Sequence, residues 1–239
     1  MSINSSSLKS PLRNPLCVAL DVDSEERALS LAEQLASQVG GFKLGPRLVY
    51  KGGQALVQKI SKLAPVFIDC KFFDIPSTME ASVRASFEAG ASLVTVHALA
   101  GEEALRVLAK LEMELSQRRP FRILCVTILT SWTEASLPSN LRAQPIPEHV
   151  RELAELVKRS GLQSIVCSAE EMEILKDLNL FMVTPGIRFS DEEKGDQKRI
   201  SGPKEAMQKG SSVLVVGRPI IDAKDPVQAA NQYLKAIQF

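Results

Sequence analysis

The sequence Pro65-Val-Phe-Ile-Asp-Cys-Lys71 opens with four apolar residues and closes with two charged residues around a cysteine. Short apolar runs of this kind are typical of buried strands, and they recur along the chain with a segment of helical periodicity after each. The expected strands are residues 16–21, 41–45, 65–71, 92–97, 121–129, 163–167, 180–184 and 212–217. Eight β-then-α units predict an α/β fold, a (β/α)8 TIM barrel, with an open doubly wound sheet as the second choice.

The length of the chain and the segment after the first expected strand support one barrel domain. Between residues 24 and 39, apolar side chains share one helical face, and Ser24 can cap the first turn. At 239 residues the chain falls in the range where an α/β barrel runs as one unit. We therefore expect a flexible, polar leader at residues 1–14 and a single catalytic barrel domain at residues 15–239.

The charge balance and the cysteines narrow the class of protein. Lys plus Arg number 29 and Asp plus Glu 28, so no overall field favours nucleic acid or an anionic membrane. The four cysteines lie within or at the end of apolar runs without CxxC spacing, which indicates buried thiols in a reducing compartment. The amino terminus lacks the apolar run of a signal peptide, and no apolar stretch reaches about 18 residues. We expect a cytoplasmic protein that does not span a membrane.

Polar residues stand at the ends of several expected strands, where a barrel gathers its catalytic groups: Asp21, Lys43, Asp69, Lys71 and His97. Alternate residues of a strand share a face, so Asp69 and Lys71 are expected to point the same way and to meet Lys43 in the barrel mouth. The alternatives are a purely structural ion-pair network and a Mg²⁺ site on Asp21 and Asp69. The two lysines argue against a cation, and His97 is expected to be a hydrogen-bonded structural residue.

A second group of polar residues follows the last two expected strands. The segments 184–188, 195–199 and 216–219 carry glycines, a glutamine and several arginines where barrels commonly bind phosphate. Arg218 can clamp a phosphate with two hydrogen bonds, and Gly217 lets the backbone approach closely. For Arg188 and Gln197 a solvated loop is the alternative.

Several other catalytic motifs are absent from the sequence. Neither the glycine-rich fingerprint of a dinucleotide fold nor that of a P-loop is present. With only two histidines and no nucleophile elbow, hydrolysis by a catalytic triad is disfavoured.

The long stretches 131–147 and 186–202 follow the fifth and seventh expected strands and suggest lids over a sequestered substrate.

Nine motifs in register match a known pattern. Residues 69–78, Asp-Cys-Lys-Phe-Phe-Asp-Ile-Pro-Ser-Thr, fit DxKxxDIPxT. The others are ALDV at 19–22, FKLG at 42–45, VHA at 96–98, LTS at 129–131, VCSA at 166–169, TPGIR at 184–188, GDQ at 195–197 and GRP at 217–219. Over residues 16–237 the chain resembles the orotidine 5'-phosphate decarboxylase family, most closely its compact bacterial form.

The resemblance implies a homodimer that decarboxylates orotidine 5'-monophosphate (OMP) to uridine 5'-monophosphate (UMP) with no metal and no organic cofactor. By position, Lys71 would protonate the carbon that carbon dioxide leaves, and Asp69 would lie beside the departing carboxylate. Asp74 would complete the charged array from the neighbouring subunit, and Thr78 would reach the ribose across the same interface. The remaining implied contacts are Asp21 and Lys43 with the ribose, Lys43 also within the array, Thr130 with the base, and Arg188, Gln197, Gly217 and Arg218 with the phosphate.

Three other functions remain open at this point. A sugar-phosphate decarboxylase or hexulose-phosphate synthase of the same superfamily is similar around DxKxxD but uses Mg²⁺ and carries a glutamate where this chain has Lys43. A Schiff-base aldolase would need a lysine of depressed pKa, whereas flanking carboxylates raise a lysine's pKa. A regulatory protein that binds phosphate without catalysis is the third alternative.

Overall fold

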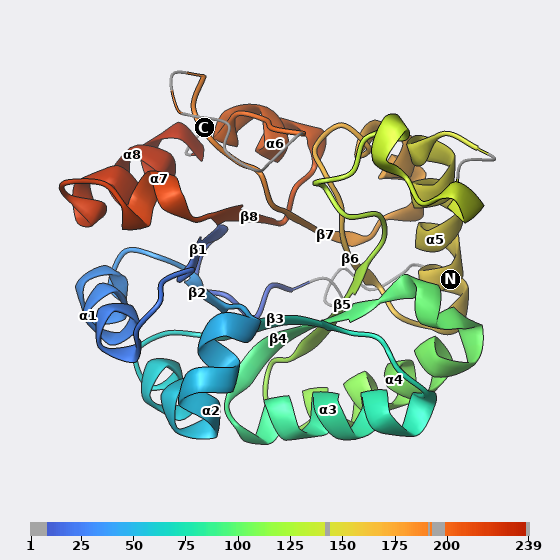
Figure 1. Ribbon diagram of the computed structural model, residues 1–239, viewed down its shortest axis with the longest axis horizontal. Helices are drawn as coiled ribbons and strands as arrows, with labels where there is room; N and C mark the ends of the chain where they lie inside the picture. Colours follow the sequence, from blue (N-terminus) through green and yellow to red (C-terminus); the bar gives the residue numbers. More distant parts are fainter. Residues whose placement is uncertain (1–8, 142–143, 191, 193–198, 238–239) are drawn as a thin grey trace.

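The computed structural model describes residues 9–141, 144–190, 192 and 199–237. Eight parallel strands pair in chain order and close into a barrel, with β8 next to β1. Figure 1 shows the strands around the centre of the molecule and the helices outside them. The predicted (β/α)8 barrel is therefore confirmed.

The strands lie within or close to the predicted segments, and most are shorter. They are β1 Leu16–Ala19, β2 Gly41–Leu44, β3 Val66–Phe72, β4 Ala91–His97, β5 Arg122–Val126, β6 Ser164–Val166, β7 Phe181–Thr184 and β8 Val213–Val216. The residues lost from the predicted ends, such as Asp21 and 127–129, have left the ladder at its carboxyl end. They are polar or lie at the start of long loops, and parallel pairing stops where the chain turns towards the next helix.

The helices form the outer layer. They are α1 Glu25–Leu35, α2 Pro46–Ser61, α3 Pro76–Glu88, α4 Gly101–Ser116, α5 Ile146–Ser160, α6 Pro203–Lys209, α7 Arg218–Ile221 and α8 Pro226–Ile237. In the described part of the link from β6 to β7 the chain forms a short 3-10 helix, η5 Glu173–Leu178, in the place of an α-helix. The predicted cap of α1 is present, because the Ser24 side chain accepts a hydrogen bond from the Arg27 amide at 3.2 Å. None of the helices in the described ranges has the length and apolar character needed to cross a membrane.

Two apolar cores hold the layers together. The larger lies between the strands and the helices, and the smaller fills the barrel itself. The inner core contains Cys17, Phe67, Leu93, Leu124 and Phe181, which are almost fully buried. Because alternate strand residues face inwards, this packing also directs the residues near the carboxyl ends of the strands into the barrel mouth.

The amino-terminal end of the barrel is covered by residues 9–14, the last part of the expected leader. Leu12 is buried in the inner core. Arg13 donates from its guanidinium to the carbonyls of Ala36 (3.2 Å) and Leu63 (2.9 Å). The Lys9 carbonyl accepts a bond from Arg122 Nε at 3.1 Å. This part of the leader therefore packs against the barrel, and residues 1–8 lie outside the described part.

Candidate active site

A cavity of about 480 Å³ lies at the carboxyl-terminal mouth of the barrel. Its walls include eight of the residues predicted from the sequence: Asp21, Lys43, Asp69, Lys71, Thr130, Arg188, Gly217 and Arg218. One side carries the charged groups of β2 and β3, and apolar residues of β5 to β8, including Val126, Val166 and Val183, form another part of the wall. The cavity thus offers fixed charges next to a surface suited to a planar, partly apolar group.

Asp69 is the centre of a partly buried charged array. Its Oδ2 lies 3.1 Å from Lys43 Nζ, and its Oδ1 lies 2.9 Å from Lys71 Nζ. The side chains of Asp69 and Lys43 are 13% and 18% exposed, whereas that of Lys71 is 39% exposed. Lys71 is therefore the ammonium group of the pair that a molecule in the cavity can reach most easily.

The protonation of the array follows from these distances. Burial alone would raise the pKa of Asp69, but the charges and hydrogen bonds of Lys43 and Lys71 outweigh it and hold the pKa at about 2. Burial would lower the pKa of Lys43, but the charge and hydrogen bond of Asp69 outweigh it and raise the pKa. Asp69 is thus a carboxylate and Lys43 an ammonium at neutral pH. Such an array can stabilise developing negative charge without reorganising.

Thr95 of β4 is a residue of this array that the sequence analysis missed. Its hydroxyl bonds both Asp69 Oδ1 and the Lys71 amide, each at 2.9 Å. The contact between Asp69 and Lys71 was predicted from regular strand alternation, but the backbone of Lys71 is left-handed, with φ 48°. The sequence signal that could have identified Thr95 was its place as a polar residue on the inner face of the apolar run 92–97.

Asp21 lies at the rim of the cavity, away from the centre of the array. Its side chain is 65% exposed, and its Oδ1 lies 3.8 Å from Arg47 Nε. Arg47 also donates to Asp23 Oδ1 at 3.0 Å. These exposed ion pairs contribute little stability, so Asp21 is free to accept bonds from a ligand hydroxyl.

The predicted phosphate-binding residues lie across the cavity from the array. Arg188 is 8% exposed, and its amide donates to the Ser201 carbonyl at 3.1 Å, which joins the two ends of the loop after β7. Arg218 begins α7 directly after Gly217, at the carboxyl end of β8. A side chain at position 217 would meet Ala19 at ordinary contact distance, so the glycine matters for what enters the cavity more than for packing. Gln197 lies outside the described residues.

Arg199, grouped by sequence with the phosphate-binding segments, is used differently. Its guanidinium forms an ion pair with the buried Glu171 and donates to the Leu129 carbonyl at 3.0 Å. Glu171 also accepts a bond from the Ser168 amide at 2.6 Å. These contacts join the loops that follow β5, β6 and β7, so Arg199 holds together the loops on this side of the cavity. Arg199 is not one of the described residues that line the cavity.

Asp74 and Thr78 lie outside the cavity of this single chain. Both are exposed, and Asp74 Oδ1 accepts a bond from the Ile75 amide at 2.7 Å. The neighbouring side chains of Phe73 and Ile75 are 62% and 64% exposed. The chain by itself therefore brings Lys43, Asp69 and Lys71 together but not Asp74.

The remaining titratable candidates have structural contacts. His97 Nδ1 accepts a bond from the Leu99 amide at 3.3 Å, which caps the short 3-10 helix Ala98–Ala100, as a structural histidine would. Burial and the charge of Lys71 lower the pKa of His97. Three of the four cysteines are buried, and Cys70 is half-buried. Within the described ranges, no group of three or more His, Cys, Asp or Glu side chains is placed to hold a metal ion.

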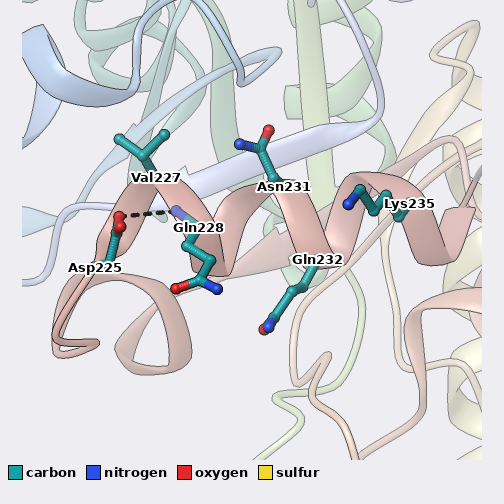
Figure 2. Close-up of a pocket in the computed structure, with 6 residues that line it drawn as sticks. All are labelled: Asp225, Val227, Gln228, Asn231, Gln232 and Lys235. Atoms are coloured by element: carbon teal, nitrogen blue, oxygen red, sulfur yellow. Dashed lines mark hydrogen bonds between the residues drawn. The ribbon is translucent and has the colours of Figure 1, made fainter.

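A second hollow of about 340 Å³ runs along the outside of α8 (Figure 2). It is lined by Asp225, Val227, Gln228, Asn231, Gln232 and Lys235. Asp225 Oδ1 accepts a bond from the Gln228 amide at 2.9 Å, as expected at the start of a helix. The lining comes from one helix and its cap, without convergent charges, so the barrel mouth is the stronger candidate site.

Comparisons with known proteins agree with the geometry. The family model described as "Orotidine 5'-phosphate decarboxylase / HUMPS family" matches residues 14–233. A protein of Paramagnetospirillum magneticum named orotidine 5'-phosphate decarboxylase is 39% identical over 226 residues, which cover 92% of this chain and 96% of the relative. A protein of Trichlorobacter lovleyi with the same name is 40% identical over 224 residues, 92% of this chain and 93% of the relative.

A solved structure extends the similarity to three dimensions. The crystal structure of orotidine 5'-phosphate decarboxylase from Lactobacillus acidophilus is 31% identical and superposes with a TM-score of 0.82. The match covers 95% of this chain and 100% of that one. The family model spans nearly the whole barrel and the relatives match over almost their full length. The chain belongs to the orotidine 5'-phosphate decarboxylase / HUMPS family.

Proposed function

We propose that this protein is a carboxy-lyase that decarboxylates OMP to UMP, the last step of de novo pyrimidine nucleotide synthesis. The observation that carries the proposal is the placement of Asp69 between the ammonium groups of Lys43 and Lys71, at 3.1 and 2.9 Å, in one wall of the cavity. A sugar-phosphate decarboxylase or hexulose-phosphate synthase of the same superfamily would have a glutamate at the position of Lys43. The lysine favours the nucleotide reaction over the Mg²⁺-dependent one.

Lys71 is the proton donor in this mechanism. Loss of carbon dioxide from OMP leaves the electron pair of the broken C–C bond on a ring carbon, in the plane of the ring, where the π system cannot delocalise it. An ammonium group held by Asp69 stabilises that charge and then transfers a proton to the carbon, which gives UMP. The reaction balances with one proton taken up for each carbon dioxide released, and no metal or organic cofactor takes part.

The other site residues bind the substrate. Asp69 lies beside the departing carboxylate, Asp21 and Lys43 bind the ribose, and Thr130 binds the base. The proposed phosphate contacts are Arg188, Gln197, Gly217 and Arg218. Phosphate binding far from the reacting carbon positions the base against the array, so remote binding energy is expressed in turnover.

We further propose a homodimer in which Asp74 and Thr78 serve the partner's site. Three exposed apolar side chains support this face as an interface: Phe73, Ile75 and Leu99. Phe73 lies against His97, at 5.7 Å between ring centroids, and His97 in turn bonds the Leu99 amide. These residues therefore form one surface around Asp74. In the proposed dimer a second subunit covers this surface, and the Asp74 of each subunit completes the charged array of the other.

The test is an absorbance assay of purified protein with OMP, with and without EDTA. We expect a steady loss of OMP absorbance that the chelator does not change. Activity that vanishes with EDTA would favour the Mg²⁺-dependent relatives, and trapping of a substrate adduct by borohydride would favour an aldolase. No absorbance change at all would leave a phosphate-binding protein without this activity.

A further inference from the structure

Thr95 lies where the charged array meets an irregularity in the pairing of β3 with β4. It is fully buried in β4, and its hydroxyl lies 2.9 Å from both Asp69 Oδ1 and the amide nitrogen of Lys71. A carboxylate can only accept and an amide N–H can only donate, so the hydroxyl must donate to Asp69 and accept from Lys71. Both of its polar bonds are therefore made to the pair itself.

This irregularity in the β3–β4 register explains why the Lys71 amide needs a side-chain partner. Ile68 pairs with Val94 and Phe72 with Val96, so three residues of β3 stand opposite a single residue, Thr95, of β4. Lys71, one of these three, has φ 48°, a left-handed conformation that residues other than glycine rarely adopt. Its amide bonds the Thr95 hydroxyl in place of the regular main-chain ladder.

We propose that Thr95 is a positioning residue that sets the distance between Lys71 and Asp69, an inference that rests on the proposed decarboxylation. One hydroxyl holds the backbone of the proton donor and one oxygen of the carboxylate that holds its ammonium group. Thr95 is 0% exposed and does not line the cavity, so it acts only through these two residues.

Thr127 provides a matched comparison inside the same barrel. It is also 0% exposed, and its hydroxyl donates to the Val166 carbonyl at 3.1 Å. That bond joins the residue that follows β5 to the last residue of β6 and reaches no charged group. A threonine-to-valine change there removes a similar buried bond without touching Asp69 or Lys71.

The kinetic test compares Thr95→Val with Thr95→Ser and Thr127→Val. Valine keeps the shape of threonine but can neither donate to Asp69 nor accept from Lys71. Loss of one partner of a buried hydrogen bond predicts a fall in the kcat for OMP of about 10- to 100-fold in Thr95→Val, with KM changed less than about threefold. Thr95→Ser keeps the hydroxyl and is expected to restore most of kcat, and Thr127→Val is expected to keep the wild-type value.

Three results would overturn the proposal: a wild-type kcat in Thr95→Val, an equal loss of kcat in Thr127→Val, or no recovery in Thr95→Ser. If Thr95→Val does not fold, Thr95→Ala replaces it. A wild-type protein that leaves OMP unchanged would refute the proposed function instead. The crystal structure of the valine variant then decides the role of Thr95: a separated Lys71–Asp69 pair supports it, and an unchanged 2.9 Å contact with left-handed Lys71 overturns it.

Discussion

Each end of the barrel contains a partly buried acidic group, and the pKa values of the two groups shift in opposite directions. At the carboxyl end, Lys43 and Lys71 hold the pKa of Asp69 at about 2. At the amino end, Glu112 of α4 accepts a bond from the Ile123 amide, at the start of β5. Burial raises the pKa of Glu112 to about 7, because that amide bond and the charge of Arg122 do not offset it. The partners of a buried group, more than burial itself, decide its charge.

The two ends also differ in access. The carboxyl end opens into the cavity, while residues 9–14 cover the amino end, with Leu12 in the inner core and Arg13 bonded to two backbone carbonyls. This agrees with the division found in barrel enzymes, where chemistry takes place at the carboxyl ends of the strands and the other end provides stability. Changes at the carboxyl end should therefore alter activity, and changes at the amino end should alter stability alone.

The largest expected effect is that of Lys71→Ala. In the proposed mechanism Lys71 supplies both the charge that stabilises the carbanion and the proton, so the alanine variant should show a fall in kcat of about 10⁴-fold or more. Binding of UMP, measured by calorimetry, should largely survive. The exposed Lys59 on α2 offers a matched control, and Lys59→Ala should keep full activity. Retained turnover in Lys71→Ala would exclude the proposed mechanism.

Arg218→Ala tests the opposite wall of the same cavity. If Arg218 binds the phosphate as proposed, loss of this charge-assisted contact should raise the KM for OMP about 10- to 100-fold. The free nucleoside orotidine lacks the phosphate, so its kcat/KM should change much less. Equal losses for the two substrates would contradict the phosphate role of Arg218 and would assign it to the structure of the loop.

The sequence predicted the array more completely than it predicted the residues that hold it. Lys43, Asp69 and Lys71 stood out because charged residues are rare in apolar strands. Thr95 did not, because a threonine in such a run has the pattern of any β-branched strand residue. The local sequence also does not predict the left-handed backbone of Lys71, because that conformation depends on the register of β3 against β4.

Contacts between distant segments set a second limit to prediction. Residues 9–14 carry no periodic pattern, and their fit to the amino end depends on backbone carbonyls from Ala36 and Leu63, far along the chain. The same holds for Arg199, whose pairing with Glu171 joins loops that only the closed barrel brings together. For Asp74 and Thr78 the predicted role needs a second chain.

Glu112→Gln tests the amino end through pH. Because the pKa of Glu112 is raised from 4.5 to about 7, only the unfolded chain loses this proton between these values, and stability falls as pH rises through that window. The full shift would correspond to about 3 kcal/mol, and screening of this half-buried side chain reduces the expected effect to about 1–2 kcal/mol. Glutamine has no proton to lose and still accepts from Ile123. Urea unfolding at pH 4.5 and 8 should therefore show a smaller loss of stability in the variant, with kcat unchanged.

The smallest expected effect is that of Arg13→Ala. The variant loses the guanidinium bonds to Ala36 and Leu63, at 3.2 and 2.9 Å, but keeps the bond from the Arg13 amide to the Gly40 carbonyl. Because the guanidinium is exposed, water replaces part of what is lost, and we expect a fall in the free energy of unfolding of about 1 kcal/mol. Arg13→Lys, which can keep one of the two bonds, should lie between the variant and the wild type. A change in kcat for OMP with either variant would show that the amino end influences the array, and the division between the two ends would then fail.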